Sequence, residues 1–136
     1  MSASNEEIIR RFLALWATRD ADAMAALFAV DGLYDNVPDK RPLMGRDAIR
    51  TWLAACFDHL TRIDVEILNM ASSGDWVLCE RLDDHVMGDK HMVLPVMNAS
   101  RLMHGKIVMF RDYYDRQTVT ELGMDPEQSL APERKS

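Results

Sequence analysis

A change in hydrophobic periodicity near residue 61 limits the possible folds of this chain more than any other feature. Before it, apolar residues recur every three or four positions, as on one side of a helix; after it they alternate with polar residues, as in strands. Helices followed by consecutive strands predict an α+β domain and not alternating βαβ units. We therefore expect a curved, mixed or antiparallel sheet that wraps around three N-terminal helices and makes a cone with an apolar interior.

Three helices are predicted before that change. Ser4 and Glu7 have the spacing of a capping box, which starts a first helix of about four turns. Asp20 or Asp22 caps a second, shorter helix over residues 23–28. The order is then an Asp31–Gly32 turn, a short strand over residues 33–37, a loop over residues 38–45 and a third helix from 46 to about 60.

Four strands joined by tight turns are predicted in the second half. Pro95 lacks a backbone N–H, so we expect a β-bulge or a sheet edge where it interrupts the third of them. The four strands are predicted over residues 61–70, 76–84, 91–103 and 107–114.

Length and charge restrict the classes of function. The 136 residues suffice for one domain, expected over residues 1–122, and the polar, proline-punctuated residues 123–136 predict a flexible tail. A net charge of −6 with no basic stripe makes nucleic acid and anionic membranes poor partners. The sequence has no apolar run of membrane-spanning length and starts with polar residues, so we expect a cytoplasmic protein.

The residues that could bind a metal are scattered. Cys56 and Cys79 lack the spacing of a zinc site and are expected to be free thiols in a reducing cytoplasm. The four histidines, including His85, lack the i, i+4 spacing of a helical metal site, and we expect them at the surface or in loops. The sequence predicts neither a metal nor another cofactor.

The strand over residues 76–84 carries a charged pair at one end of an apolar face. Alternation places Val77, Cys79, Arg81 and Asp83 on the same face. Because a buried charge is costly unless it is paired, the Arg81–Asp83 pair is either a structural strut or a functional site.

Two other strands also place polar groups at the end of an apolar run. On the last strand, Asp112 shares a face with Phe110, while Ile107 is expected on the opposite face. On the first strand, Tyr34 and Asn36 share a face and offer two neutral hydrogen-bonding groups. We expect the three strands to bring these groups together in one pocket.

Two carboxylates and a guanidinium in a dry pocket cannot all titrate alike. The better paired acid stays ionised, whereas the other keeps its proton. This division provides a general base and a general acid, and Tyr34 and Asn36 could hold a water against the base.

The order of these groups resembles one family. The pattern Tyr34-x-Asn36, Arg81-x-Asp83, Arg111-Asp112-Tyr113-x-Asp115 is similar to that of the limonene-1,2-epoxide hydrolase family, and the likeness extends over residues 6–120. Residues 45–49 and 94–97 also fit, although these segments recur across the wider superfamily, and Phe110 stands where many relatives have Trp. The resemblance implies the cone-shaped fold shared with nuclear transport factor 2 (NTF2-like), ketosteroid isomerase and the SnoaL polyketide cyclases.

The resemblance further implies a cofactor-independent, one-step hydrolysis of a small apolar epoxide. Asp112 would take a proton from a water held by Tyr34 and Asn36, and that water would attack an epoxide carbon. Asp83, protonated, would donate to the ring oxygen, and Arg81 would bridge the two acids. The chemistry of epoxides is consistent with this mechanism. Ring strain drives the opening, so the protein needs only to position a water, remove one proton from it and donate another to the ring oxygen.

Two other functions stay open at this point. An isomerase or polyketide cyclase on the same cone needs a base and an oxyanion donor, but it has no use for an arginine between two acids. In a non-catalytic protein that binds an apolar ligand, we would expect an apolar residue in place of at least one of the five polar residues. None of the five is replaced here. The resemblance also implies a homodimer that pairs through the outer sheet face, where Trp76, Leu78 and Leu82 would otherwise be exposed.

Overall fold

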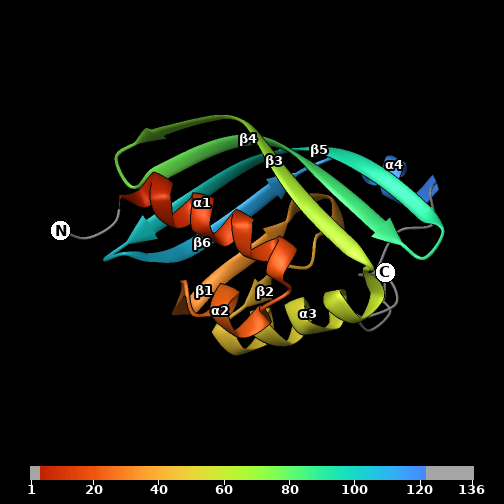
Figure 1. Ribbon diagram of the computed structural model, residues 1–136. Coiled ribbons are helices and arrows are strands. Elements are labelled where there is room, and N and C mark those ends of the chain that lie inside the picture. Colours follow the sequence, from red (N-terminus) through yellow and green to blue (C-terminus); the bar gives the residue numbers. More distant parts are fainter. Residues whose placement is uncertain (1–3, 122–136) are drawn as a thin grey trace.

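The computed structural model describes residues 4–121, which form a curved sheet with helices against its inner face (Figure 1). The helices are α1 (Asn5–Leu15), α2 (Ala21–Ala25), α3 (Arg46–His59) and α4 (Arg116–Glu121), with short 3₁₀ helices η1 (Trp16–Thr18) and η2 (Val37–Asp39). The strands are β1 (Phe28–Asn36), β2 (Leu43–Met44), β3 (Arg62–Ser73), β4 (Trp76–Met87), β5 (Lys90–Met103) and β6 (Lys106–Tyr113). The predicted tail over residues 123–136 lies outside the described residues.

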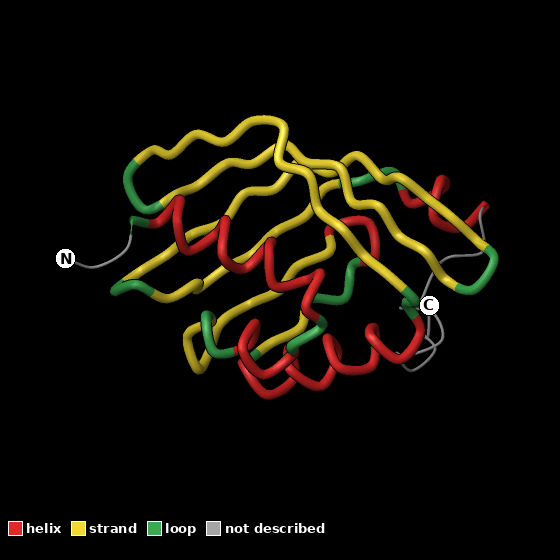
Figure 2. The backbone as a smooth tube through the Cα atoms, in the orientation of Figure 1, coloured by secondary structure: helices red, strands yellow, loops and turns green. Residues whose placement is uncertain are grey.

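The sheet joins the two halves of the chain. Its six strands have the order β2-β1-β6-β5-β4-β3, in which β1 runs parallel to β6 and every other pairing is antiparallel. The predicted α+β architecture with a curved, mixed sheet is therefore confirmed. Figure 2 shows the long strands β3, β4 and β5 bending over the helices, so that the inner face of the sheet closes around a shared interior.

The helix starts follow the predicted capping chemistry. Ser4 Oγ accepts a hydrogen bond from the backbone N–H of Glu7 at 3.2 Å, and Asp20 Oδ1 accepts one from Ala23 at 3.0 Å. Each bond satisfies a backbone donor that has no partner inside its helix. Of the two predicted caps for the second helix, Asp20 is the correct one.

The predicted end of that helix and the turn after it were wrong. The helix stops at Ala25, and Phe28 begins β1, where it pairs with Ile107 and is fully buried. The predicted Asp31–Gly32 turn is an irregular stretch inside β1, between Phe28 and Leu33. A Cβ atom at Gly32 would lie 3.0 Å from the Ile107 carbonyl oxygen, so the glycine permits the close approach of β1 to β6.

The predicted faces of β6 were partly wrong, because the strand contains a bulge. Arg101 pairs with Met109 and Leu102 with Ile107, which leaves Val108 as an extra residue between two paired positions. Alternation therefore restarts at Val108, and Ile107 is buried on the core side together with Phe110, contrary to prediction.

The predicted edge at Pro95 is confirmed, but the predicted bulge is absent. Pro95 pairs with Leu82 in an unbroken β4–β5 register. On its other side, β6 pairs with β5 only as far as Met97, so β5 has a partner strand on one side only at Pro95.

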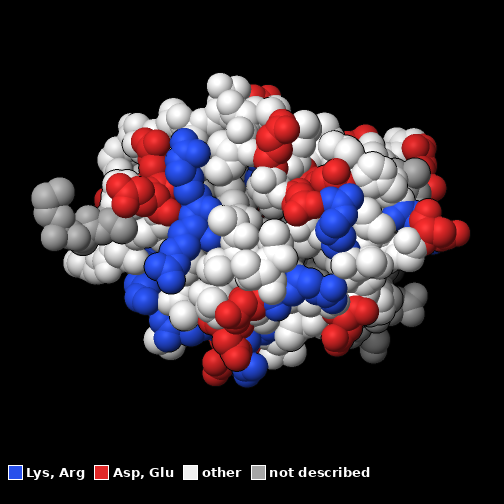
Figure 3. Space-filling model, in the orientation of Figure 1, with Lys and Arg blue, Asp and Glu red and all other residues white. Residues whose placement is uncertain are grey.

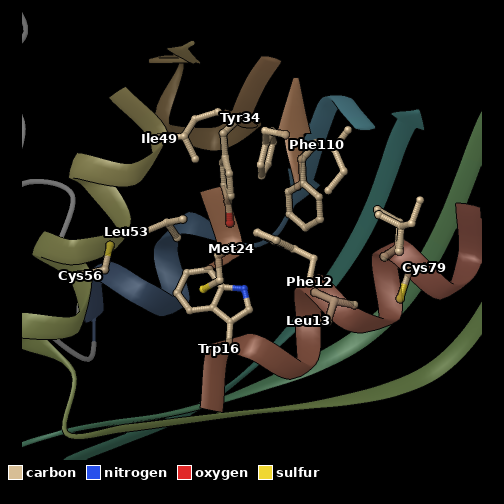
Figure 4. Close-up of a cluster of buried hydrophobic side chains, with 14 of the residues drawn as sticks. Phe12, Leu13, Trp16, Met24, Tyr34, Ile49, Leu53, Cys56, Cys79 and Phe110 are labelled. Atoms are coloured by element: carbon tan, nitrogen blue, oxygen red, sulfur yellow. The ribbon is translucent and has the colours of Figure 1, made fainter. Parts of the chain in front are cut away.

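The core lies between the inner sheet face and the helices (Figure 4). Phe12 of α1 is fully buried and makes edge-on ring contacts with Phe28 at 5.4 Å and Phe110 at 4.8 Å between centroids. Cys56 and Cys79 are buried in the same cluster as free thiols, as predicted. Tyr34 enters this cluster from β1, so the polar site is built directly against the packed core.

The surface of the described residues fits the charge pattern of the sequence. On the face shown in Figure 3, a band of basic side chains runs down the left side next to acidic groups, and separate acidic and basic groups cover the rest. Within residues 4–121, no helix is both long and apolar enough to cross a membrane.

The outer face of the sheet carries apolar side chains. Leu78, Met97 and Tyr113 are 43%, 44% and 46% exposed, and Met97 pairs directly with Tyr113 across β5 and β6. Trp76 and Leu82, which were expected on the same face, are only partly exposed.

We propose that two copies of the chain pair through this face. Light scattering at micromolar concentration should give the mass of a dimer, and Met97→Arg should shift the protein towards monomer because it places a charge in the apolar contact. The matched control is Met44→Arg, at a methionine that is 72% exposed on β2. A monomeric wild-type protein would contradict the proposal.

Candidate active site

A cavity opens between the inner face of the sheet and the helices. Its volume is about 80 Å³, several times what a single water needs. All five polar residues predicted for the site line it, together with apolar side chains from every side: Tyr34, Asn36, Arg81, Asp83 and Asp112, with Trp16, Trp52, Leu60, Ile63, Leu94 and Val96.

Arg81 bridges the two acids. Its Nε and one terminal nitrogen lie 2.8 and 3.1 Å from the two oxygens of Asp83. Its terminal nitrogens lie 2.9 and 2.8 Å from the two oxygens of Asp112. Arg81 is 2% exposed and both acids are buried, so all four contacts are made away from solvent. A planar guanidinium fits this double fork, whereas an ammonium could not.

Sheet register brings the site together. Arg81 and Asp83 are alternate residues of β4, and their neighbours across the sheet on β5 are Val96 and Leu94. Asp112 of β6 is paired with Asn98 on one side and with Asn36 on the other. Because β1 runs parallel to β6, residues from the two ends of the chain meet at one place in the sheet.

Asp112 receives a further bond that the sequence did not predict. Asn98 Nδ2 donates to Asp112 Oδ1 at 2.8 Å and to the Arg111 carbonyl at 2.9 Å. Ser100 Oγ donates to Asn98 Oδ1 at 2.6 Å and so fixes the orientation of the amide. Asn98 and Ser100 are buried on the inner face of β5, after three buried apolar residues at alternate positions. The sequence did contain a sign of this: the alternating inward residues of β5 change there from apolar to polar.

The site holds its polar groups in defined protonation states. Burial, and then the charge of Asp112, raise the pKa of Tyr34 well above its usual value, so the hydroxyl keeps its proton. Burial alone would lower the pKa of Arg81, but Asp112 and Asp83 outweigh it and hold that pKa above its usual range. Burial raises the pKa of Cys56 to about 12, so this thiol is not ionised at neutral pH.

The charges of the cluster do not balance if both acids are ionised. One guanidinium would then face two carboxylates, which leaves a net negative charge in a buried place. Phe110 lies beneath the guanidinium, 5.7 Å from ring centroid to Arg81 Cζ, and shields that side from water.

His85 was expected at the surface or in a loop, and that prediction was wrong. It lies on β4, two residues after Asp83, and alternation turns it to the same inner face, where it lines the cavity. Burial lowers the pKa of His85, so the ring is neutral at neutral pH.

A second polar cluster closes one rim of the cavity. Tyr114 donates its hydroxyl to Asp39 Oδ2 at 2.9 Å, and Arg116 also bonds Asp39. Val119 of α4 packs on Met92, Leu94 and Val96 of β5. Arg116 belongs to α4, a helix that the sequence did not predict, so its bond to Asp39 ties α4 to η2.

No group of three or more histidine, cysteine or acidic residues within residues 4–121 is arranged to hold a metal ion. The fold and the site together define a cone-shaped α+β domain with a buried acid–arginine–acid bridge.

Comparison with known proteins gives the family. Residues 9–110 match the SnoaL-like domain, and the chain belongs to the SnoaL-like domain family, with the NTF2-like α+β fold.

Solved structures share this fold at low sequence identity. A protein of ketosteroid isomerase-like fold from Catenulispora acidiphila is 23% identical, with a TM-score of 0.80 over 91% of this chain and 98% of that one. An LEH-like epoxide hydrolase from M. tuberculosis is also 23% identical, with a TM-score of 0.76 over 91% and 92% of the two chains. A protein described as a SnoaL-like polyketide cyclase, from Shewanella putrefaciens, is 14% identical, with a TM-score of 0.77 over 86% and 83%. Proteins described as enzymes of different chemistry therefore share this fold, so the fold alone does not fix the activity.

Proposed function

We propose that the protein hydrolyses a small epoxide to a vicinal diol in one step, by direct attack of water. The observation that carries the proposal is the double fork of Arg81 between Asp83 and Asp112, at the wall of a largely apolar cavity. Opening an epoxide with water requires one proton to be removed and one to be supplied, and two acids with unequal surroundings can do both.

Asp112 is the general base. It accepts hydrogen bonds from both Arg81 and Asn98, whereas the described side-chain bonds of Asp83 come from Arg81 alone. Among the described contacts, its Oδ1 accepts two hydrogen bonds and its Oδ2 one, so Oδ2 keeps capacity for a water. Asn36 is the neighbour of Asp112 across β1 and β6, and Tyr34 lines the same cavity, so both can hold this water.

Asp83 is the general acid. Its described side-chain hydrogen bonds are the two from Arg81, and the longer of these, at 3.1 Å, reaches Oδ2. We assign the donated proton to Oδ2, the oxygen with the longer of the two contacts. This proton passes to the epoxide oxygen as the ring opens, while Asp112 takes a proton from the attacking water. The proton on Asp112 returns to Asp83 before the next turnover.

Arg81 holds the two acids at a fixed distance and offsets their negative charge throughout the reaction. Ring strain drives the opening, so the protein contributes position and proton transfer without a covalent intermediate. The likeness to an LEH-like epoxide hydrolase supports the proposal at the level of the fold. An isomerase or cyclase would need a base beside an oxyanion donor, and the arginine fork would have no role in it.

The direct test is incubation with a panel of small epoxides, with detection of diols by mass spectrometry. Asp112→Asn should lower the rate more than about tenfold while the protein stays folded, because an amide cannot accept the proton of water. The matched control is Asp64→Asn, at an exposed acid of β3 that pairs with Arg62, and it should turn over normally. Absence of diol from the whole panel would overturn the proposal, and an Asp112→Asn variant above a tenth of the wild-type rate would remove Asp112 as the base.

Arg81→Lys should be nearly as inactive as Arg81→Ala. A lysine restores the positive charge but cannot donate to all four carboxylate oxygens, and removing a partner from a buried ion pair also costs about 3–5 kcal/mol of folding free energy. Activity should therefore be compared at a temperature where circular dichroism shows both variants folded. The control is Arg62→Lys at an exposed ion pair. Near-normal turnover in Arg81→Lys would mean that charge alone suffices.

A further inference from the structure

The cavity contains a polar side chain that the proposed reaction does not use. Nδ1 of His85 is enclosed and has no hydrogen-bond partner among residues 4–121. An enclosed polar atom without a partner costs about 1–3 kcal/mol, so a protein that retains one needs a reason. In this place, a ligand can supply the missing partner.

The surroundings of His85 are apolar on the strands to either side. Its neighbours across the sheet are Ile63 of β3 and Met92 of β5, and both line the cavity. A leucine would suit such a position better than an imidazole. The ring is neutral at neutral pH, because burial lowers its pKa more than the charge of Asp83 and a hydrogen bond with the Asp83 backbone raise it, so Nδ1 is the ring nitrogen left to bind a ligand. Its natural complement is a neutral polar group.

The other polar groups at this end of the cavity already have partners within the protein. Tyr114 donates to Asp39, and Arg116 pairs with the same carboxylate. At this end of the cavity, a ligand would therefore form its hydrogen bond with His85.

The distance along β4 fixes where the polar group of the ligand must be. Arg81, Asp83 and His85 are successive inward residues of one strand, so His85 lies roughly 7 Å beyond Asp83. A half-turn about its Cβ–Cγ bond exchanges Nδ1 with a ring carbon, which lets the nitrogen meet a ligand without moving the backbone. An extended chain reaches roughly 3.3–3.6 Å for every three bonds, so about five bonds span most of this distance and the hydrogen bonds at the two ends span the rest.

We infer that the substrate is an epoxide that carries a second, neutral polar group, such as a hydroxyl, about five bonds from the ring, and that His85 binds this group. The inference rests on the proposed function and narrows the predicted substrate from an apolar epoxide to a bifunctional one. His85 is then a specificity-determining residue, outside the proton transfers of Asp83 and Asp112.

The test compares a terminal epoxyhexane with the epoxyhexanol that has a hydroxyl at the other end of the same chain. Wild-type protein should prefer the epoxyhexanol in kcat/KM by about tenfold, the size expected for one hydrogen bond. His85→Leu should lose this preference, and His85→Gln, which keeps a donor and an acceptor, should retain part of it. The matched control is His91→Leu, since His91 is exposed and bonds Asp84 outside the cavity. Equal rates for the two substrates in wild-type protein, or an unchanged preference in His85→Leu, would overturn the inference.

A stability measurement separates this role from a structural one. Because His85→Leu removes an unpartnered polar atom from an apolar place, its melting temperature should be equal to or above that of wild-type protein. A clear fall would assign His85 to the fold and overturn the inference. Should His85→Leu fail to fold, that result counts in the same way.

Failure of the proposed function would be recognised separately. If neither epoxide is hydrolysed, the hydrolase proposal fails, and calorimetric binding of the hexanetriol and hexanediol products decides the role of His85. Tighter binding of the triol that disappears in His85→Leu, but not in His91→Leu, would support the His85 contact on its own. Equal binding of the two products would overturn it.

Discussion

The double fork of Arg81 is the interaction on which the rest of this structure depends. A buried guanidinium between two carboxylates is tolerable only if all of its partners are held in place, since removing one leaves an uncompensated charge. Asp83 comes with Arg81 on β4, but Asp112 must be delivered from β6. The chain meets this requirement by placing β5 between the two strands, where Asn98 bonds Asp112 directly and is itself held by Ser100. The sheet therefore acts as the frame that fixes the distance between two acids.

The irregular parts of the sheet complete that frame. The stretch of β1 around Gly32 and the bulge at Val108 of β6 shift the two parallel strands until Asn36 stands beside Asp112. Behind the site, Tyr34 packs against Phe110 with 5.0 Å between ring centroids, so the rings that build the core also orient the polar groups. Stability and the arrangement of the site are thus supplied by the same contacts. The polar residues keep the protonation states that a dry, packed interior imposes on them.

Much of this arrangement follows from local sequence, and the failures have physical causes. Two-residue alternation placed Arg81 with Asp83, and Tyr34 with Asn36, on the correct faces, because a strand fixes its own side-chain directions. It failed at Ile107 and at Asp31–Gly32, because a bulge is decided by the neighbouring strand and not by the strand that carries it. His85 and Asn98 were missed for a different reason. Each continues an inward alternation into a polar residue, which is the same signal that revealed Arg81, but only their contacts across the sheet show that they belong to the cavity.

The central claim is that a water, positioned beside Asp112, attacks the epoxide directly. Asn36 and Tyr34 beside a carboxylate are the arrangement expected for holding water, whereas a carboxylate that attacked the ring itself would form an ester and need no such support. The most direct measurement is a single turnover in oxygen-18 water with enzyme in excess, followed by mass spectrometry of both diol and protein. Direct attack predicts one labelled oxygen in each diol molecule from the first turnover. An unlabelled first-turnover diol, or label in the peptide that carries Asp83 or Asp112, would show a covalent intermediate and contradict the account.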